Sequence, residues 1–377
     1  MLTPTLKAAG QRLHFVVTFL LAAALVPAML WAGLPLKFDW LVLLQTFWVA
    51  FAFQSIFAAV LLYLIGFPAE ETFRPLWLRY NQDKRRLLLL AAFLGFLFLL
   101  YSRLASLAVF PFMVIVALAV LEFLERTQSQ AASLSGTLSP VLVPAVYLFF
   151  GLVLVSAFND VAVSSRPYVS YDALFNRADS WILMGGTVPG LVHHALTALP
   201  LGVFKFLEVV YYYCMFPQVG AALILLAFNY GRTRALRFTG TLLMAYYLSL
   251  VLFWVWPSQG PFFLCAPHFA DFPASLGTYS IQKRLLVQAS SLWAGKGLNA
   301  VSLDYYIAFP SMHVAVPLIV AWYLRRWKRV ACFLLAVDLL LVVSILLLEW
   351  HYFVDLLGGI VVAAVSLLIV GDASAID

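Results

Sequence analysis

The chain has 377 residues, of which 64% are hydrophobic and only 11% charged, and its mean hydropathy is +0.98. A soluble domain carries roughly 25% charged residues, so this composition excludes an ordinary water-soluble globule and indicates an integral membrane protein with many spans. The net charge of +6 is what basic loops that orient such spans would produce, so it makes no case for nucleic-acid binding.

Ten apolar runs predict transmembrane helices, because a backbone inside the bilayer must satisfy its own hydrogen bonds. The third and fourth runs are weakly separated, so one long bent helix is an alternative there. The first is expected to be a retained span, since it is too long for a signal peptide and lacks a small-residue cleavage site. The runs are 13–33, 40–66, 87–102, 104–124, 139–157, 204–228, 235–256, 312–324, 329–348 and 352–371.

We therefore expect an all-α polytopic membrane fold with about ten transmembrane helices. About four of them, in residues 1–138, would form an N-terminal module that carries no motif. The other six lie in residues 139–377.

Basic residues predict the orientation of these spans. With the N-terminus in the cytoplasm, 15 of the 23 Lys and Arg fall on the cytoplasmic side, and most of the others lie in two long outer loops, 158–203 and 257–311. Both termini are then cytoplasmic, and we expect a bacterial inner membrane with the active site on its periplasmic or extracytoplasmic face. Each long loop contains an amphipathic stretch, 170–183 and 276–293, that is typical of a helix lying at the membrane interface.

Ionisable side chains at a membrane edge are costly and indicate function. The stretch "AFPSMH" places His313 at the start of the eighth run, and "HYFVD" places His351 and Asp355 where the ninth run meets the tenth. Both sites fall on the outer face, so two adjacent helix ends can bring the histidines together. His351 and Asp355 are spaced i, i+4, so on a helix the carboxylate holds one imidazole nitrogen and leaves the other free to attack.

A phosphate site is predicted beside these residues. Ser311 follows a proline and suits the N-cap of the eighth helix, whose first-turn amides can hold an anion. His313, two residues later, would then give or take a proton next to the bound phosphate. The pattern predicts phosphoryl transfer on a lipid through a phosphohistidine.

"FPSMH" followed by "S-x6-H-Y-x2-D" resembles the second and third motifs of the type 2 phosphatidic acid phosphatase superfamily. Phe309 and the run "HYFVDLLGG" resemble more narrowly its inositol phosphorylceramide synthase branch, and the resemblance covers roughly residues 139–371. It implies that the six helices in residues 139–377 form a catalytic core with the phosphatase-type arrangement. It also implies that His351 is the nucleophile, that Asp355 orients it, that His313 acts as acid and then base, and that Ser311 contacts the phosphate.

The chain departs from that family at its phosphate-binding cations. Ile345 stands where the third motif often has arginine, and the first motif, K-x6-R-P, is not recognisable. The loop 257–311 is the right place for replacements, so Lys283, Arg284 and Lys296 are candidate substrate-binding residues. Snorkelling to lipid head groups is the alternative for all three.

The prediction is a lipid phosphotransferase that moves a phosphoryl or head-group-phosphoryl unit, such as phosphoinositol, between membrane lipids, with no cofactor and no metal. A phosphatase that hydrolyses a lipid or polyprenyl phosphate is the alternative, since one phosphohistidine serves both reactions. A transporter of lipid-linked substrates is the alternative of another class, although it usually shows repeated halves. Trp350 is expected to be an interface anchor. Donor, acceptor and oligomeric state stay open.

Overall fold

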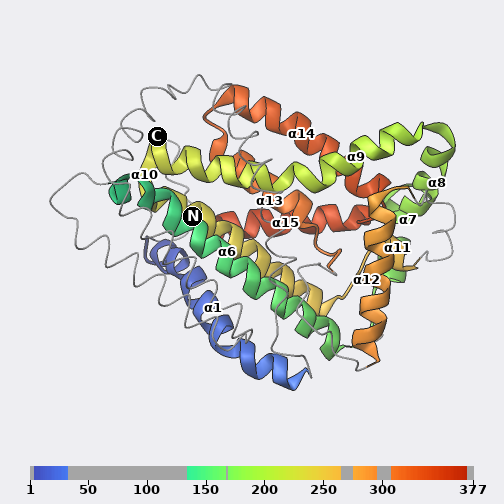
Figure 1. The fold of residues 1–377 in the computed structure, drawn as a ribbon, viewed down its shortest axis with the longest axis horizontal. Helices are drawn as coiled ribbons and strands as arrows, with labels where there is room; N and C mark the ends of the chain where they lie inside the picture. Colours follow the sequence, from blue (N-terminus) through green and yellow to red (C-terminus); the bar gives the residue numbers. More distant parts are fainter. Residues whose placement is uncertain (1–3, 33–133, 167–168, 265–274, 295–306, 372–377) are drawn as a thin grey trace.

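The computed structural model of the chain describes residues 4–32, 134–166, 169–264, 275–294 and 307–371. Within these ranges the chain forms eleven helices and no strand, which confirms the all-α prediction (Figure 1). The predicted spans 40–66, 87–102 and 104–124 lie outside the described residues, so the ten-span count and the division near residue 138 stay predictions. The helices are α1 (Pro4–Trp31), α6 (Leu134–Ser165), α7 (Asp172–Ile182), α8 (Val188–Ala198), α9 (Leu201–Tyr213), α10 (Met215–Val255), α11 (Pro261–Leu264), α12 (Gly277–Trp293), α13 (Met312–Leu324), α14 (Lys328–Leu347) and α15 (Phe353–Ile369).

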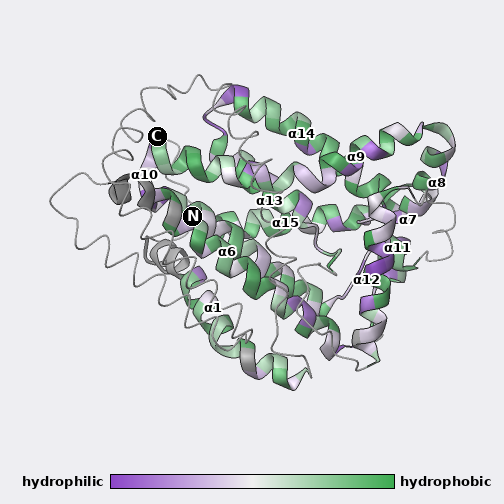
Figure 2. Cartoon of the chain, viewed as in Figure 1, coloured by the Kyte–Doolittle hydropathy of each residue, from purple (hydrophilic) through white to green (hydrophobic). Residues whose placement is uncertain are grey.

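Three helical segments are long and apolar enough to cross a membrane, which supports an integral membrane protein. They are Val143–Ser165, Leu201–Val255 and Lys328–Leu347. Hydrophobic residues cover most of the long helices, whereas hydrophilic ones gather at helix ends and on α12 (Figure 2).

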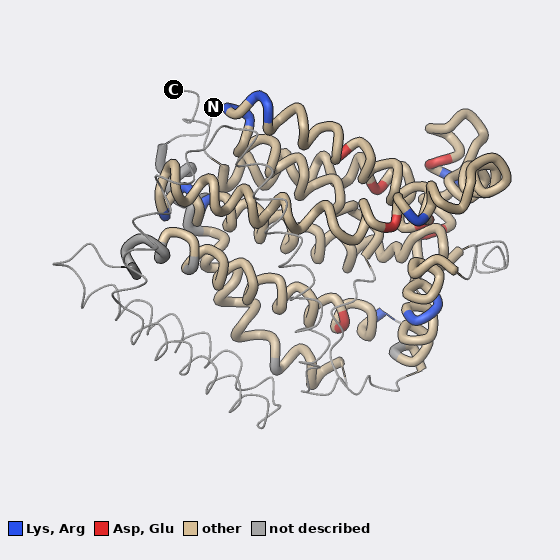
Figure 3. The backbone as a smooth tube through the Cα atoms, turned by 45° about the horizontal axis from the view of Figure 1, so that its top comes forward, with Lys and Arg blue, Asp and Glu red and all other residues tan. Residues whose placement is uncertain are grey.

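The longest of these segments bends at Gly231, which has a φ of 76° and a ψ of −178°. A non-helical conformation of this kind is accessible to glycine because it has no Cβ. The bend joins two helical arms, close to the predicted runs 204–228 and 235–256. Lys and Arg of this bend gather with those of the α13–α14 turn at one end of the bundle (Figure 3).

The helix α6 is longer than the sequence predicted. The expected span ended at residue 157, just before the polar residues Asn159 and Asp160. In the structure the helix continues to Ser165, and both polar side chains are almost fully buried. The prediction of a loop from residue 158 was therefore wrong for its first two turns.

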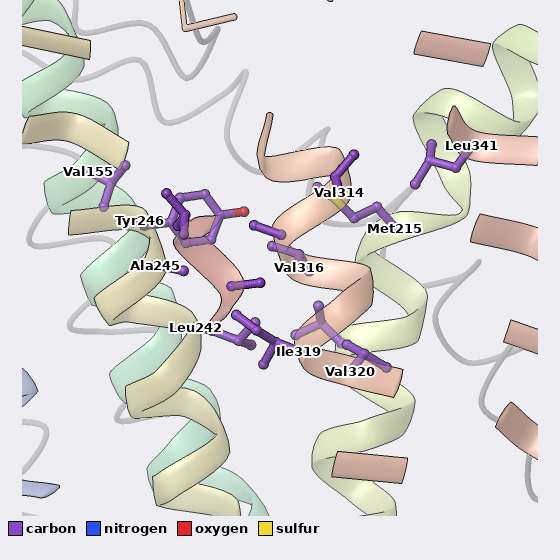
Figure 4. Packing of buried hydrophobic residues seen from close by; sticks show 14 of the residues in the cluster. Val155, Met215, Leu242, Ala245, Tyr246, Val314, Val316, Ile319, Val320 and Leu341 are labelled. Atoms are coloured by element: carbon purple, nitrogen blue, oxygen red, sulfur yellow. The ribbon is translucent and has the colours of Figure 1, made fainter. Parts of the chain in front are cut away.

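The short helix α13 lies between the two arms of α10 (Figure 4). Its side chains Val316 and Ile319 lie on the side of Leu242 and Ala245 of the second arm. All of these residues are buried. Because lipid tails are as apolar as these side chains, close van der Waals packing rather than the hydrophobic effect stabilises such contacts within a bilayer.

Two adjacent glycines, Gly358 and Gly359, let α15 pack closely against the residues that precede α13 in sequence. A Cβ on Gly358 would lie 2.6 Å from the Phe309 ring, and a Cβ on Gly359 would collide with the carbonyl oxygen of Ser311. The run "HYFVDLLGG" is thus explained partly by packing, because α15 carries Asp355 and must lie against the segment that carries His313.

Replacing Gly359 with alanine is expected to destabilise the protein by about 1–3 kcal/mol, because the obstacle is a backbone atom that cannot rotate away. The matched control is Gly202→Ala on α9, where no atom lies within 4 Å of the added methyl group. The thermal unfolding midpoint in detergent measures both. Equal midpoints for the two variants would show that the close approach places no constraint on position 359.

The first helix docks onto α6 and α10 through a buried polar cluster. His14 Nδ1 lies 2.9 Å from the hydroxyl of Tyr147, and the Thr18 hydroxyl lies 2.9 Å from that of Tyr147 and 2.7 Å from that of Tyr247. Gly240 leaves room for the His14 ring. Satisfied polar contacts of this kind specify how helices pair inside a membrane.

The predicted amphipathic stretches form α7 and α12, which confirms that they are helical. They lie with α8 and α11 at the end of the bundle opposite the Gly231 bend (Figure 1). On α7 and the turn after it, Leu174, Trp181 and Met184 are exposed. The opposite face of α7 is buried.

Candidate active site

The two histidines come together at this end of the bundle. His313 lies in the first turn of α13, and His351 lies in the short segment between α14 and α15. The Nδ1 atom of His313 is 3.2 Å from the Nε2 atom of His351. The expected juxtaposition of the two stretches is confirmed, whereas the catalytic roles of these residues stay predictions.

Asp355 completes a line of three side chains. Its Oδ2 atom lies 3.3 Å from Nδ1 of His351 and accepts a hydrogen bond of 2.8 Å from the Tyr352 amide. If His351 donates from Nδ1 to this carboxylate, its Nε2 atom carries the lone pair, and His313 must donate to it from Nδ1. This tautomer assignment follows from the hydrogen-bond pattern and leaves Nε2 of His351 as the nucleophilic atom.

Burial keeps His351 in its neutral form. The residue is only 3% exposed, and this loss of water lowers its pKa to about 4, although a hydrogen bond with the Ala308 backbone opposes the shift. The last turn of α14 holds the segment in place, because the carbonyl of Ile345 accepts from the amides of Trp350 and His351. At neutral pH the imidazole is therefore unprotonated and able to attack.

Ser311 occupies the N-cap position of α13, as predicted, but its side chain makes no capping hydrogen bond. The residue is fully buried, and its Oγ atom has no hydrogen-bond partner among the described residues. Its amide donates to the carbonyl of Asp355 at 3.0 Å, which ties the start of α13 to α15. A buried hydroxyl without a partner is unfavourable and fits a group that awaits a ligand.

Aromatic rings cover one side of the histidine pair. Tyr211 on α9 stacks on Trp350 with a centroid distance of 5.1 Å and lies 4.8 Å from the ring of His313. Trp350 is only 8% exposed, so the expectation that it anchors the interface was wrong. Its ring instead packs beside the site.

A second carboxylate lies close to the site in sequence and was not among the predicted site residues. Glu349, two residues before His351, is 5% exposed and has a φ of 57°. Burial raises the pKa of Glu349 to about 7. Its place inside the motif was the only available signal.

Two of the three predicted cations lie in the described residues, on α12. Lys283 and Arg284 are exposed on α12, whereas their neighbour Gln282 is buried and donates to the carbonyl of Leu348 at 2.8 Å. Lys296 lies outside the described residues. All three stay predicted phosphate ligands.

A second pair of acidic residues reaches the site from α7. Asp172 and Asp179 are buried and seven residues apart, so they share the buried face of that helix. The sequence analysis did not single them out, and only this spacing within an amphipathic stretch could have identified them. Among the described residues, no group of three His, Cys, Asp or Glu side chains is arranged to hold a metal ion.

Comparison with known proteins identifies one family. The family model described as the PAP2 superfamily matches residues 177–369, just over half of the chain, from within α7 to the end of α15. The matched range includes both histidines and Asp355. No curated protein matches the chain, and no solved structure matches it.

Proposed function

Because the chain belongs to the PAP2 superfamily, whose members are lipid phosphatases or phosphotransferases, we propose that it passes a phosphoryl or head-group-phosphoryl unit between lipids through a phosphohistidine at His351. The observation that carries this proposal is the line of contacts from Asp355 through His351 to His313. Nucleophilic catalysis requires an imidazole that a carboxylate orients and that lies within hydrogen-bonding distance of a second residue able to transfer a proton.

In the first step, Nε2 of His351 attacks phosphorus and the bond to the lipid oxygen breaks. His313 must be doubly protonated at this point, which the anionic phosphate beside it favours, and it gives one proton to the lipid oxygen, which leaves as an alcohol while His313 becomes neutral. Since Nε2 lies only 3.2 Å from His313 before substrate binds, the phosphate must replace this hydrogen bond when it enters. The unpartnered hydroxyl of Ser311 is then available to donate to a phosphate oxygen.

In the second step, His313 takes a proton from the acceptor. The acceptor oxygen attacks phosphorus, and the bond between phosphorus and Nε2 breaks. With an alcohol the reaction is transfer, and with water it is hydrolysis. We propose transfer, on the resemblance of Phe309 and "HYFVDLLGG" to the inositol phosphorylceramide synthase branch, with lipid phosphate hydrolysis as the second candidate.

The cations of α12 are proposed to help to hold the phosphate. Lys283 and Arg284 flank Gln282, which bonds to the segment just before His351, so α12 is attached to the catalytic loop. Lys296 follows α12 in sequence and is proposed for the same role. The outer, extracytoplasmic face and cytoplasmic termini are part of this proposal.

Two probe reactions test the function. The purified protein in lipid vesicles is given phosphatidylinositol with fluorescent ceramide, or radiolabelled phosphatidic acid, beside the variants His351→Ala and His194→Ala. His194 is exposed on α8 and serves as the control. We expect one reaction to proceed with wild type and control but not with His351→Ala. Absence of both reactions, or equal turnover by His351→Ala, contradicts the proposal.

A further inference from the structure

The helix α7 buries three side chains, of which two contact the segments that carry the histidines and the third holds a turn that is bonded to one of those segments. Asp172, Phe175 and Asp179 lie on one face, because residues three, four and seven apart align along a helix. These contacts are distant in sequence, so they define a link between otherwise separate parts of the site.

Asp172 holds the turn after α10. Its Oδ1 atom accepts hydrogen bonds from the Ser258 hydroxyl at 2.8 Å and from the amides of Gln259 and Gly260 at 3.0 Å each. The carbonyl of Ser258 in turn accepts from the amide of Ala308 at 2.8 Å. Asp172 is thereby connected, through Ser258, to Ala308 in the segment that leads into α13.

Phe175 lies between the two motifs. Its ring centroid is 4.8 Å from that of Phe309, just before Ser311, and 6.4 Å from that of Tyr352, just after His351. The ring therefore packs against a residue of each histidine segment.

Asp179 caps α15. Its two oxygens accept from the amides of Phe353 at 2.8 Å and Val354 at 2.9 Å, which are the first two residues of that helix. Asp355 already accepts from the amide of the N-cap residue Tyr352, and a carboxylate 174 residues away satisfies the amides of the next two residues. A negative charge also interacts favourably with a helix N-terminus.

This cap is not an ordinary surface feature. Asp179 is fully buried, and burial raises its pKa despite the two amide bonds. Burying an acidic group costs free energy. A serine at the N-cap would satisfy a helix end without this cost, so capping alone does not explain why Asp179 is buried here. The bonds of Asp179 fall between His351 on one side and Asp355 on the other.

We propose that Asp179 is a positioning residue, which fixes the start of α15 so that Asp355 and His351 keep the geometry needed for attack, and that α7 as a whole holds the two histidine segments in register. The inference rests on the proposed function. Asp179 does not touch the substrate, so it acts through the orientation of His351.

The test compares Asp179→Asn and Asp179→Ala with Arg177→Gln, a charge-removing change at an exposed position of the same helix. Asparagine keeps one acceptor oxygen and alanine keeps none, so kcat should fall in that order, by up to about 10²-fold for a misplacement near 1 Å. KM should stay close to the wild-type value. The assay is whichever of the two probe reactions the wild type supports.

The pH profile provides a readout that a merely structural cap would not move. Wild-type kcat/KM should fall as the pH drops through about 4, when His351 becomes protonated. Loosening the start of α15 admits water, so the acid limb of Asp179→Asn should shift to higher pH. Circular dichroism and the unfolding midpoint establish that the variant is folded.

The outcomes separate the two proposals. If wild type and Arg177→Gln are active and Asp179→Asn matches them in kcat and pH profile, the positioning role is wrong and the function stands. The same holds if activity falls only in proportion to unfolded protein. If the wild type supports neither probe reaction, the proposed function itself fails.

Discussion

Replacing His351 with alanine is expected to reduce turnover by about 10⁴-fold or more, because it removes the atom that would form the bond to phosphorus. The loss should appear in kcat and in kcat/KM alike, since no alternative nucleophile lies on the line from Asp355 to His313. The fold should survive, because His351 lies in the segment between α14 and α15 and outside both helices.

Rapid acid-free quenching with radiolabelled donor provides the direct measurement. Wild-type protein should retain label that is stable to base and released by acid, which is the behaviour of a phosphohistidine, and His351→Ala should retain none. The variant His194→Ala, changed at an exposed histidine of α8, should label like wild type. Label on His351→Ala would move the nucleophile to another residue.

Replacing His313 with alanine is expected to reduce kcat/KM for a lipid donor by about 10²- to 10⁴-fold, the usual contribution of a general acid. The effect should depend on the leaving group. A lipid alkoxide needs the proton that His313 holds 3.2 Å from Nε2 of His351, whereas the nitrophenolate of p-nitrophenyl phosphate leaves without one. The variant should therefore lose far less kcat/KM with the aryl phosphate.

The comparison uses kcat/KM because this parameter covers the steps up to release of the leaving group and leaves out the later attack by the acceptor. The variant His193→Ala, exposed on α8, is the control. Equal losses with lipid and aryl donors would mean that His313 binds the phosphate or shapes the pocket rather than supplying a proton.

The helices of the C-terminal half were predictable because their boundaries coincide with local signals. The runs 312–324, 329–348 and 352–371 match α13, α14 and α15 within two residues at each end. Proline, basic residues and the His-Tyr pair mark these ends in the sequence. α6 was mispredicted for the opposite reason, since Asn159 and Asp160 are polar but buried by long-range packing that local composition does not reveal.

The site was predictable where one motif contains the whole contact. His351 and Asp355 meet through their own spacing, and topology alone was enough to bring His313 to them. Asp172 and Asp179 were not singled out, because the segments that they hold lie 86 to 175 residues away. Their spacing within the amphipathic stretch places them on one face of a helix, but it does not distinguish a buried face from a solvated one.

The packing of Gly358 changes how the branch resemblance is interpreted. Phe309 and Gly358 are two of the residues that suggested the synthase branch, and they touch each other, since a Cβ on Gly358 would lie 2.6 Å from the Phe309 ring. A pair that fits together in this way reports a shared backbone arrangement. A shared backbone arrangement does not by itself identify the donor or the acceptor. The substrate therefore has to be identified by the probe reactions.

The two faces of α7 contact different surroundings. One face packs against the histidine segments, and the opposite face carries Leu174 and Trp181, which are 53% and 87% exposed. If α7 lies at the bilayer surface, lateral pressure among the surrounding head groups acts on the same rigid body that orients His351. Detergent micelles and bilayers of different tension should then change kcat and not only the supply of lipid. Rates measured in one detergent therefore describe the protein together with its surroundings.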